Sequence, residues 1–285
     1  MAITHHNTLA TMKIVKISGT LAEQMFQYAL YLRLRHEGNN VALHAAQRHI
    51  FAAFNLNDAV VATPEQLAPY GTSLASRIKN VFNKPAAEST IVTDTFGVFS
   101  RDAISTDGNA YYRGTWASPR YFEPVADAVR QAFVLPDSRL SAAAKGAISM
   151  LGDGETVAMH IHRPTSPENT CTTDYYNWAI ANLQAFVPEA RIAVFTDAPD
   201  LVMQHILLPE GSRFVPLGAL SQTDVMQVML RTSHIVCANT LTSWWAAWLM
   251  PNPDKIVIVP QRWSANPDVQ PRDLMPIYWT AIPVT

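Results

Sequence analysis

Cysteine, charge and long apolar runs are all scarce in this sequence of 285 residues. Only Cys171 and Cys237 are present, without a paired spacing, which excludes a disulfide framework and a thiolate zinc site. The longest apolar stretches, at residues 244–250 and 256–260, are much shorter than the roughly 18 residues that span a bilayer. We therefore predict a protein of a reducing compartment without a transmembrane segment: cytoplasmic, with peripheral association at the inner membrane left open.

The low charge content also limits the partners. Charged residues make up 15% and apolar residues 48% of the chain, which is typical of a compact, well-buried protein rather than a disordered one. The formal net charge is −2 and the isoelectric point is near 6.5, so no basic field is available to hold nucleic acid. Nucleic acid is not an expected partner.

The succession of strand and helix patterns predicts two α/β domains. A strand at residues 13–17, a helix at 24–36 and a strand at 41–43 have the β-α-β order of a parallel sheet. The seventy residues that follow are less regular, although an aromatic-rich stretch stands at 111–122. The expected organisation is a disordered leader at 1–12 and Rossmann-like domains at 13–145 and 146–285.

The second half alternates more clearly and predicts a doubly wound sheet. Its expected strands are at residues 156–161, 191–195, 214–217, 234–238 and 255–259, with helices at 174–186, 199–206, 224–232 and 242–250. Ligands of such sheets bind at the carboxyl ends of the strands. This rule directs attention to residues 19–24, 160–166, 196–199 and 239–243.

Residues 239–243 permit two interpretations. A strand end that leads into a helix offers free backbone N–H groups to an anion, but Thr240 or Thr242 in that place would equally cap the helix. Periodicity alone favours capping. The tryptophans that follow are expected in the core rather than in a sugar platform, because aromatic side chains most often supply buried area. They are Trp244, Trp245 and Trp248.

His160 and His162 form a pair on one face of a presumed strand, with Ile161 pointing away. No third ligand at a telling spacing accompanies them, so a metal site is not predicted. Arg163 stands where the strand is expected to end, and its fork of donors suits a phosphate. A surface salt bridge with Glu168 is the alternative.

The turn at residues 19–24, GTLAEQ, argues against phosphate binding when it is considered alone. It has a single glycine, Gly19, where nucleotide enzymes often place several so that the backbone can approach a pyrophosphate. Glu23 brings a carboxylate near the helix N-terminus, which stabilises the helix but repels a phosphate. No serine hydrolase, zincin or P-loop pattern occurs in the chain.

Four motifs in order resemble family 11 glycosyltransferases, the bacterial α-1,2-fucosyltransferases. They are QMFQYAL at 24–30, GTWASPRYF at 114–122, FTDAPD at 195–200 and ANTLTSWWAAWLMPNPDKIVIVPQRW at 238–263. The resemblance implies an α/β fold of the GT-B type, with two Rossmann-like domains whose parallel sheets face a cleft. The N-terminal domain would lie on the acceptor side, and the C-terminal domain would hold the donor.

The resemblance also implies an activity: inverting transfer of fucose from GDP-fucose to the 2-hydroxyl of a terminal β-galactoside in glycan synthesis, without metal or another cofactor. The partners would be the nucleotide sugar and the glycan acceptor. Two alternatives stay open, a degenerate member that binds a glycan or a partner, and a transferase with a changed donor. The candidate donor-binding residues are Gln24, His160, His162, Arg163, Asp197, Asn239, Thr240 and Ser243.

The chain departs from the family pattern in two phosphate-facing motifs. Thr20, Ala22 and Glu23 replace two glycines and an asparagine of the family's Gly-Gly-Leu-Gly-Asn-Gln. In the family's His-x-Arg-Arg-Gly-Asp, the first arginine has become His162 and the aspartate has become Thr165. An imidazole is largely neutral at pH 7 and lacks the paired donors of a guanidinium.

The general base for the acceptor hydroxyl is left unassigned. His160, Glu23 and Asp174 are the candidates from the sequence, and His160 is the one retained as a catalytic candidate.

Overall fold

The computed structural model describes residues 11–71, 89–162 and 170–284. The chain forms two compact units, Met1–Val129 and Arg130–Thr285, here called the first and the second unit. This division lies upstream of the boundary between residues 145 and 146 that the sequence suggested. The physical reason is the end of helix α6 (Ala126–Phe133), which packs on tryptophans of the second unit.

The first unit contains a four-stranded parallel sheet in the order β2-β1-β4-β3. Its strands are β1 (Met12–Ile17), β2 (Asn40–Ala45), β3 (Ser89–Thr93) and β4 (Asn109–Arg113). Met12 opens β1, and its N–H donates to Asn109 Oδ1 at 2.8 Å, so it does not belong to a leader. Residues 1–10 of the expected leader lie outside the described residues.

The region that looked irregular in the sequence supplies two of these four strands. β4 pairs with both β1 and β3, and its aromatic residues Tyr111 and Tyr112 are buried. The expectation of an irregular segment was therefore wrong. β4 has only five residues, and its apolar positions are consecutive because both faces of a parallel sheet are covered, so no alternation marks the strand.

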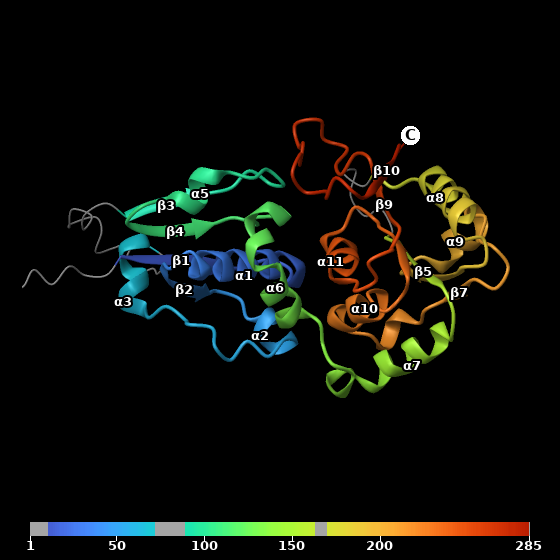
Figure 1. The fold of residues 1–285 in the computed structure, drawn as a ribbon, viewed down its shortest axis with the longest axis horizontal. Coiled ribbons are helices and arrows are strands. Elements are labelled where there is room, and N and C mark those ends of the chain that lie inside the picture. The colour runs from blue at the N-terminus through green and yellow to red at the C-terminus, as the bar shows by residue number, and fades with distance from the viewer. Residues whose placement is uncertain (1–10, 72–88, 163–169, 285) are drawn as a thin grey trace, which may run out of the picture. The chain divides into compact units, whose positions relative to one another are not determined.

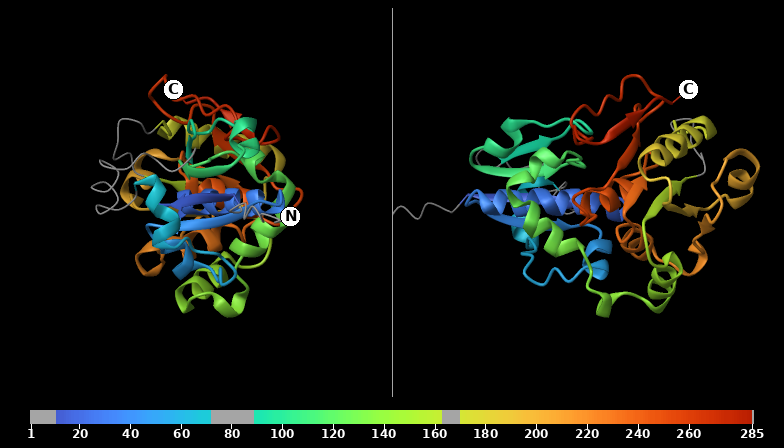
Figure 2. Two further views of the ribbon diagram at one scale, coloured as in Figure 1. Left: turned by 90° about the vertical axis from the view of Figure 1, so that its left-hand side faces the viewer. Right: turned by 45° about the vertical axis from the view of Figure 1, so that its right-hand side comes forward.

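Helices cover the first sheet and connect its strands. Helix α1 (Leu21–His36) contacts β1 and β2, and Figures 1 and 2 show it beside the sheet. The helix begins at Leu21 rather than at the expected Gln24. The other helical segments described are α2 (His49–Ala53), α3 (Pro64–Leu67), η1 (Ala68–Tyr70), α5 (Arg101–Ser105), η2 (Pro119–Tyr121) and η3 (Glu123–Val125).

The second unit contains a six-stranded parallel sheet in the order β10-β9-β8-β5-β6-β7. Its strands are β5 (Thr156–Ile161), β6 (Arg191–Thr196), β7 (Arg213–Phe214), β8 (His234–Val236), β9 (Val257–Pro260) and β10 (Thr280–Ile282). From β5 the chain adds β6 and β7 on one side and β8, β9 and β10 on the other. The predicted doubly wound sheet is confirmed, and β10 extends it beyond the sequence-based assignment.

The helices of the second unit include the four that the sequence predicted between the strands, and α7, which the sequence did not predict. They are α7 (Ala142–Leu151), α8 (Thr173–Phe186), α9 (Pro199–His205), α10 (Gln222–Met229) and α11 (Leu241–Leu249), with the short helical turns η4 (Asp137–Arg139) and η5 (Leu217–Ala219).

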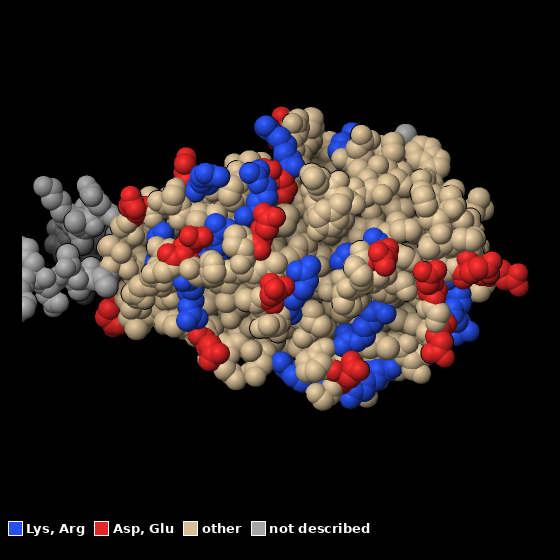
Figure 3. Space-filling model, viewed as in Figure 1, with Lys and Arg blue, Asp and Glu red and all other residues tan. Residues whose placement is uncertain are grey.

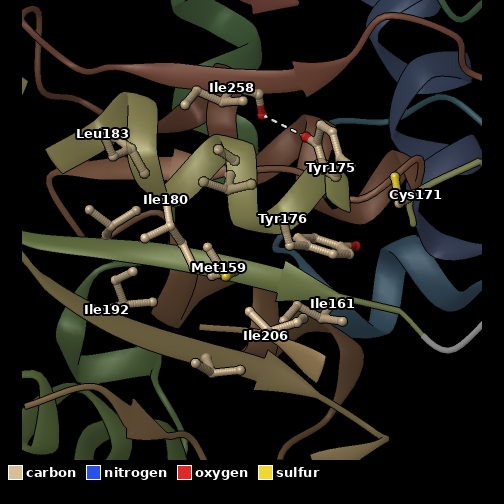
Figure 4. Packing of buried hydrophobic residues seen from close by; sticks show 14 of the residues in the cluster. Met159, Ile161, Cys171, Tyr175, Tyr176, Ile180, Leu183, Ile192, Ile206 and Ile258 are labelled. Atoms are coloured by element: carbon tan, nitrogen blue, oxygen red, sulfur yellow. Dashed lines mark hydrogen bonds between the residues drawn. The ribbon is translucent and has the colours of Figure 1, made fainter. Parts of the chain in front are cut away.

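One face of the second sheet packs on α8 (Figure 4), and Val202 of α9 belongs to the same cluster. Met159 and Ile161 of β5 and Ile192 of β6 lie in this hydrophobic cluster together with Ile180 of α8. Tyr175 fastens α8 to the strand ends: its hydroxyl donates to the backbone carbonyl of Cys237 at 2.7 Å, with the Ile258 carbonyl at 3.4 Å. Tyr175 thus fixes the positions of β8 and β9 near the ends where a ligand of such a sheet binds.

A tryptophan cluster builds the core around α11. Trp244 and Trp245 are fully buried, their ring centroids lie 5.1 Å apart in an edge-on arrangement, and Trp248 is nearly as deeply buried. The indole nitrogen of Trp244 donates to the Leu274 carbonyl at 2.8 Å. The interpretation of these residues as core is therefore confirmed, and a sugar platform is excluded.

Charge and hydropathy of the described residues agree with the composition. On the face drawn in Figure 3, basic and acidic side chains are interspersed and do not merge into one basic patch. Within the described parts of the chain, no helix is both long and apolar enough to cross a bilayer. Cys171 and Cys237 are buried free thiols, and burial raises the pKa of Cys171 to about 12.

Candidate functional site

The strand order of the second sheet reverses between β5 and β8, here called the second switch point. In open parallel sheets, ligands bind at the carboxyl ends of the strands at such a reversal. His160 lies at the end of β5, Asp197 directly follows β6, and Thr240 follows β8. Since these three strands are neighbours, the sheet brings together side chains that are up to 80 positions apart in the chain.

His160 is the residue at the centre of this arrangement. Its Nδ1 lies 3.3 Å from Thr240 Oγ1, across the switch point. Burial lowers the pKa of His160 to about 4; the neighbouring His162 acts in the same direction and Asp197 opposes it. The imidazole is therefore neutral at pH 7 and can accept a proton or a hydrogen bond.

The predicted pairing of the two histidines is confirmed. The ring centroids of His160 and His162 are 6.5 Å apart, whereas Ile161 between them points into the core under α8. Both imidazoles are half-buried at the carboxyl edge of the sheet. Arg163 and Thr165, and the proposed ion pair of Arg163 with Glu168, lie outside the described residues.

Thr240 caps α11, as the capping interpretation predicted. Its side chain accepts from the Ser243 N–H at 3.3 Å. The Ser243 side chain is fully buried, and its hydroxyl donates to the Ala238 carbonyl at 3.0 Å. Ser243 therefore holds the turn between β8 and α11, and Thr240 is the hydroxyl of this pair nearest the histidines.

Asn239 connects the switch point with the end of the next strand, β9. Its Nδ2 donates to the Trp263 carbonyl at 3.0 Å. The neighbouring Arg262 carbonyl accepts from Thr170 Oγ1 at 2.6 Å. Two hydrogen bonds thus fix the segment after β9 against the loops that follow β8 and β5.

A cleft of about 240 Å³ opens along this segment. The residues that line it include two arginines, two glutamines and one tryptophan, and no carboxylate. They are Pro260, Gln261, Arg262, Trp263, Val269, Gln270, Pro271, Arg272 and Met275. The strand ends predicted to bind a ligand are four and do not include that of β9; the arginine in PQRW is the signal that could have indicated it.

The first sheet has a corresponding reversal between β1 and β4, here called the first switch point. The GTLAEQ turn follows β1 and forms a capping box: the Thr20 hydroxyl accepts from the Glu23 N–H at 3.3 Å, and a Glu23 carboxylate oxygen accepts from the Thr20 N–H at 2.7 Å. A side chain at Gly19 would meet that carboxylate. The departures at Thr20 and Glu23 are therefore coupled, and both stabilise the start of α1.

Gln24 and Gln27 are buried beneath the first switch point. Gln24 Nε2 donates to the Gly19 carbonyl at 2.9 Å, and its Oε1 accepts from the Ile50 N–H at 3.0 Å. Gln27 spans the switch point, since its Nε2 donates to the Gly114 carbonyl at 2.9 Å and its Oε1 accepts from the Ser18 N–H at 2.8 Å. Gln24, a predicted donor contact, thus has both ends of its amide bonded within the first unit.

Asp94 fixes the loop after β4. Its two carboxylate oxygens accept from the backbone N–H groups of Thr115 at 3.2 Å and Trp116 at 2.7 Å. Burial raises the pKa of Asp94, and these two donors oppose the shift. Trp116 has a left-handed backbone, with φ of 63°, and its side chain is fully buried. Sequence reasoning missed Asp94, because nothing in the local pattern links it to residues about 20 positions later.

The remaining candidates lie apart or on the surface. Asp197 is exposed, close enough to His160 to influence its pKa. Asp174 is exposed in the first turn of α8, and the Glu23 carboxylate is engaged in its capping box. Among the described residues, no group of three or more His, Cys, Asp or Glu side chains could hold a metal ion.

Comparison with curated proteins relates the chain to glycosyltransferases. It is 22% identical to alpha-1,2-colitosyltransferase of Escherichia coli over 94% of this chain and 98% of that protein. It is 27% identical to the O-antigen biosynthesis glycosyltransferase WbnK of Escherichia coli, over 40% of this chain and 41% of that protein. No protein-family model matches the chain, so membership of family 11 stays a prediction.

Solved structures show the same fold at low sequence identity. The chain superimposes on Arabidopsis thaliana FUT1 in complex with GDP with a TM-score of 0.51 and 9% identity, over 94% of this chain and 75% of that one. For NodZ alpha-1,6-fucosyltransferase soaked with GDP-fucose, the TM-score is 0.50 and the identity 12%, over 85% and 93% of the two chains. The fold is of the GT-B type, as the resemblance implied.

Proposed function

We propose that this protein is an inverting glycosyltransferase that transfers fucose from GDP-fucose to the 2-hydroxyl of a terminal β-galactoside during glycan synthesis. The observation that carries the proposal is the second switch point, where His160 contacts Thr240 at the start of α11 and His162 lies beside His160. The similarity over 94% of the chain to a transferase that forms an α-1,2 linkage supports it.

In the proposed reaction, the bond between the sugar C1 and the β-phosphate oxygen breaks, and a bond from the acceptor 2-oxygen to C1 forms. GDP leaves with the electron pair, and the hydroxyl proton passes to a base. Negative charge grows on the diphosphate, so groups that stabilise this charge lower the barrier. Thr240 stands at the N-terminus of α11, and the partial positive charge of a helix N-terminus favours an anion.

His160 is the base candidate that the geometry supports best. It is neutral at pH 7, half-buried and held by Thr240, whereas Asp174 is exposed and Glu23 is bonded within its capping box. A nearby diphosphate would raise the pKa of His160, because an anion favours the protonated imidazole. Donor binding would therefore strengthen His160 as a base.

A second donor is also worth testing, since the relative that aligns over 94% of this chain is named for colitose. Colitose is fucose without the 3-hydroxyl. A site that hydrogen-bonds this hydroxyl discriminates by about 10⁴-fold or more, whereas a site that leaves it unbonded accepts both sugars with similar efficiency. The ratio of kcat/KM for GDP-fucose and GDP-colitose therefore distinguishes the two donors.

The decisive experiment is calorimetric titration of the purified protein with GDP and GDP-fucose near pH 7 without added metal, followed by transfer assays on terminal β-galactosides. Micromolar binding and formation of an α-1,2-linked product, identified by NMR, are expected. Binding of a β-galactoside glycan without binding of any nucleotide sugar would identify a degenerate glycan-binding protein. Transfer from a sugar other than fucose would identify a changed donor.

A further inference from the structure

We infer that Arg262 and Arg272, on the walls of the cleft after β9, bind the diphosphate of the nucleotide donor and replace the arginine that is absent at position 162. This inference rests on the proposed function but names residues that are not among the donor-binding candidates from the sequence. It begins from an electrostatic deficit: at the carboxyl edge of β5, His162 stands where the resemblance implies an arginine.

The cleft has the charge that this deficit requires. Both arginines line it and no carboxylate does. Both are exposed, and neither forms an ion pair with any described residue. Two like charges on one cleft repel each other, and an anion between them removes this repulsion. Guanidinium groups bind phosphate oxygens through paired N–H donors.

The position of the cleft also fits. β9 is the neighbour of β8 in the sheet, so the cleft continues the row of strand ends that contains Asp197, His160 and Thr240. Hydrogen bonds from Asn239 and Thr170 to the backbone of Trp263 and Arg262 hold it there. The cleft residue Trp263 is thus bonded to Asn239, which precedes Thr240 of the second switch point.

The size of the cleft fits a part of the donor rather than the whole molecule. About 240 Å³ is less than the roughly 300 Å³ or more of sites that enclose a whole small molecule. The cleft can hold a diphosphate beside the half-buried Trp263, while the rest of the donor extends along the neighbouring strand ends. The arginines would then stabilise the leaving group.

The test is calorimetric titration of GDP, UDP, ADP and dTDP into the parent and into Arg262→Ala and Arg272→Ala. Each substitution is expected to lower the affinity for the nucleoside diphosphate that binds by about tenfold, and the affinity for the corresponding monophosphate by less. Arg272→Lys should retain part of the affinity. Arg139→Ala, in the exposed turn η4, removes the same charge and should have no effect.

The outcomes separate this inference from the proposed function. If GDP binds the parent and both alanine variants equally, the arginines have no role and the donor assignment stands. If only another nucleotide binds, and the variants weaken it, the GDP assignment is wrong and the arginine site stands. Binding of none of them overturns both. Arginine-dependent binding of inorganic pyrophosphate to protein already saturated with nucleotide would place a second ligand in the cleft and overturn the inference.

Discussion

Both sheets contain a reversal of strand order, but the side chains at the two reversals differ in their bonding. At the first switch point, Gln27 bonds the loop after β1 to the loop after β4, and Asp94 accepts two backbone N–H groups of the latter. At the second, His160 and Thr240 meet at the edge of the sheet beside a cleft with two arginines. The first is cross-linked by the protein's own side chains, and the second has polar side chains available to a ligand.

This difference teaches that a reversal of strand order permits a ligand site without creating one. Buried polar groups need partners, and at the first switch point the protein supplies all the partners just named from within the unit. Two of the residues that depart from the family's glycine-rich turn are likewise partnered within the unit, because Thr20 and Glu23 bond to each other. The losses in that turn therefore do not count against donor binding in the second unit.

The largest effect is expected from Gly114→Ala, which tests whether the first switch point is filled. A Cβ at this position would overlap the Asp94 carboxylate, so Asp94 must leave its two backbone donors. We expect the free energy of unfolding to fall by about 3 kcal/mol. Urea denaturation monitored by tryptophan fluorescence measures it.

The matched control for this substitution is Gly146→Ala in α7. Nothing lies within 4 Å of a Cβ there, so the change should stabilise the protein slightly through higher helix propensity. A loss below about 0.5 kcal/mol for Gly114→Ala would show that Asp94 does not close over the glycine.

A smaller effect, on pH dependence, is expected at the second switch point. His160 has a folded-state pKa of about 4, below that of an imidazole in the unfolded chain, so the unfolded state binds more protons between these values. Stability from this group is present above the unfolded pKa of about 6.5 and is lost as the pH falls toward 4; we expect about 2 kcal/mol between pH 7 and pH 5.

Urea titrations at pH 7 and pH 5 measure this difference in unfolding free energy. In His160→Gln the difference should disappear, whereas His205→Gln, at an exposed position of α9, should show the same difference as the parent. Equal slopes for His160→Gln and the parent would mean that His160 is not held neutral in the fold. Addition of a nucleotide that binds should also reduce the loss of stability at pH 5, because its phosphate favours the protonated imidazole of His160.

The third expected effect concerns ligand affinity. His162→Arg restores a guanidinium beside His160, and we expect GDP to bind about tenfold more tightly, or about 1.4 kcal/mol. His205→Arg adds the same charge on α9 and is the matched control. Calorimetry decides the matter: if affinity is unchanged in both variants, position 162 does not face the donor.

The sequence predicted the elements of the second unit better than its ligand site. Strands and helices such as β5 and α8 repeat apolar residues with a local period, and this period is readable without knowledge of the fold. The same local reasoning placed His160 and His162 on one face, and the structure confirms it. It also assigned the capping of α11 to the threonines at its start, and Thr240 is the cap.

Features that depend on distant pairs could not be predicted. Gln27 and Gly114 are 87 positions apart, and no periodic pattern relates them. Arg262 and Arg272 stand in a segment without regular secondary structure between β9 and β10, so no period indicates which cleft they line. Such side chains become visible as parts of a site only when the strand order is known.

The smallest expected effect returns to the turn that differs most from the family. Thr20→Ala removes the side-chain cap of α1 and leaves Glu23 without one of its partners, so we expect a loss of about 1 kcal/mol in unfolding free energy. Nucleotide affinity should stay within twofold of the parent, about 0.4 kcal/mol, because the capping box serves the helix and not the donor. Glu23→Gln should likewise leave nucleotide affinity unchanged. If the Glu23 carboxylate instead repelled the phosphate of a bound nucleotide, this substitution would tighten binding. Paired stability and GDP titrations on the two variants therefore decide whether this turn is a structural cap or a degraded phosphate loop.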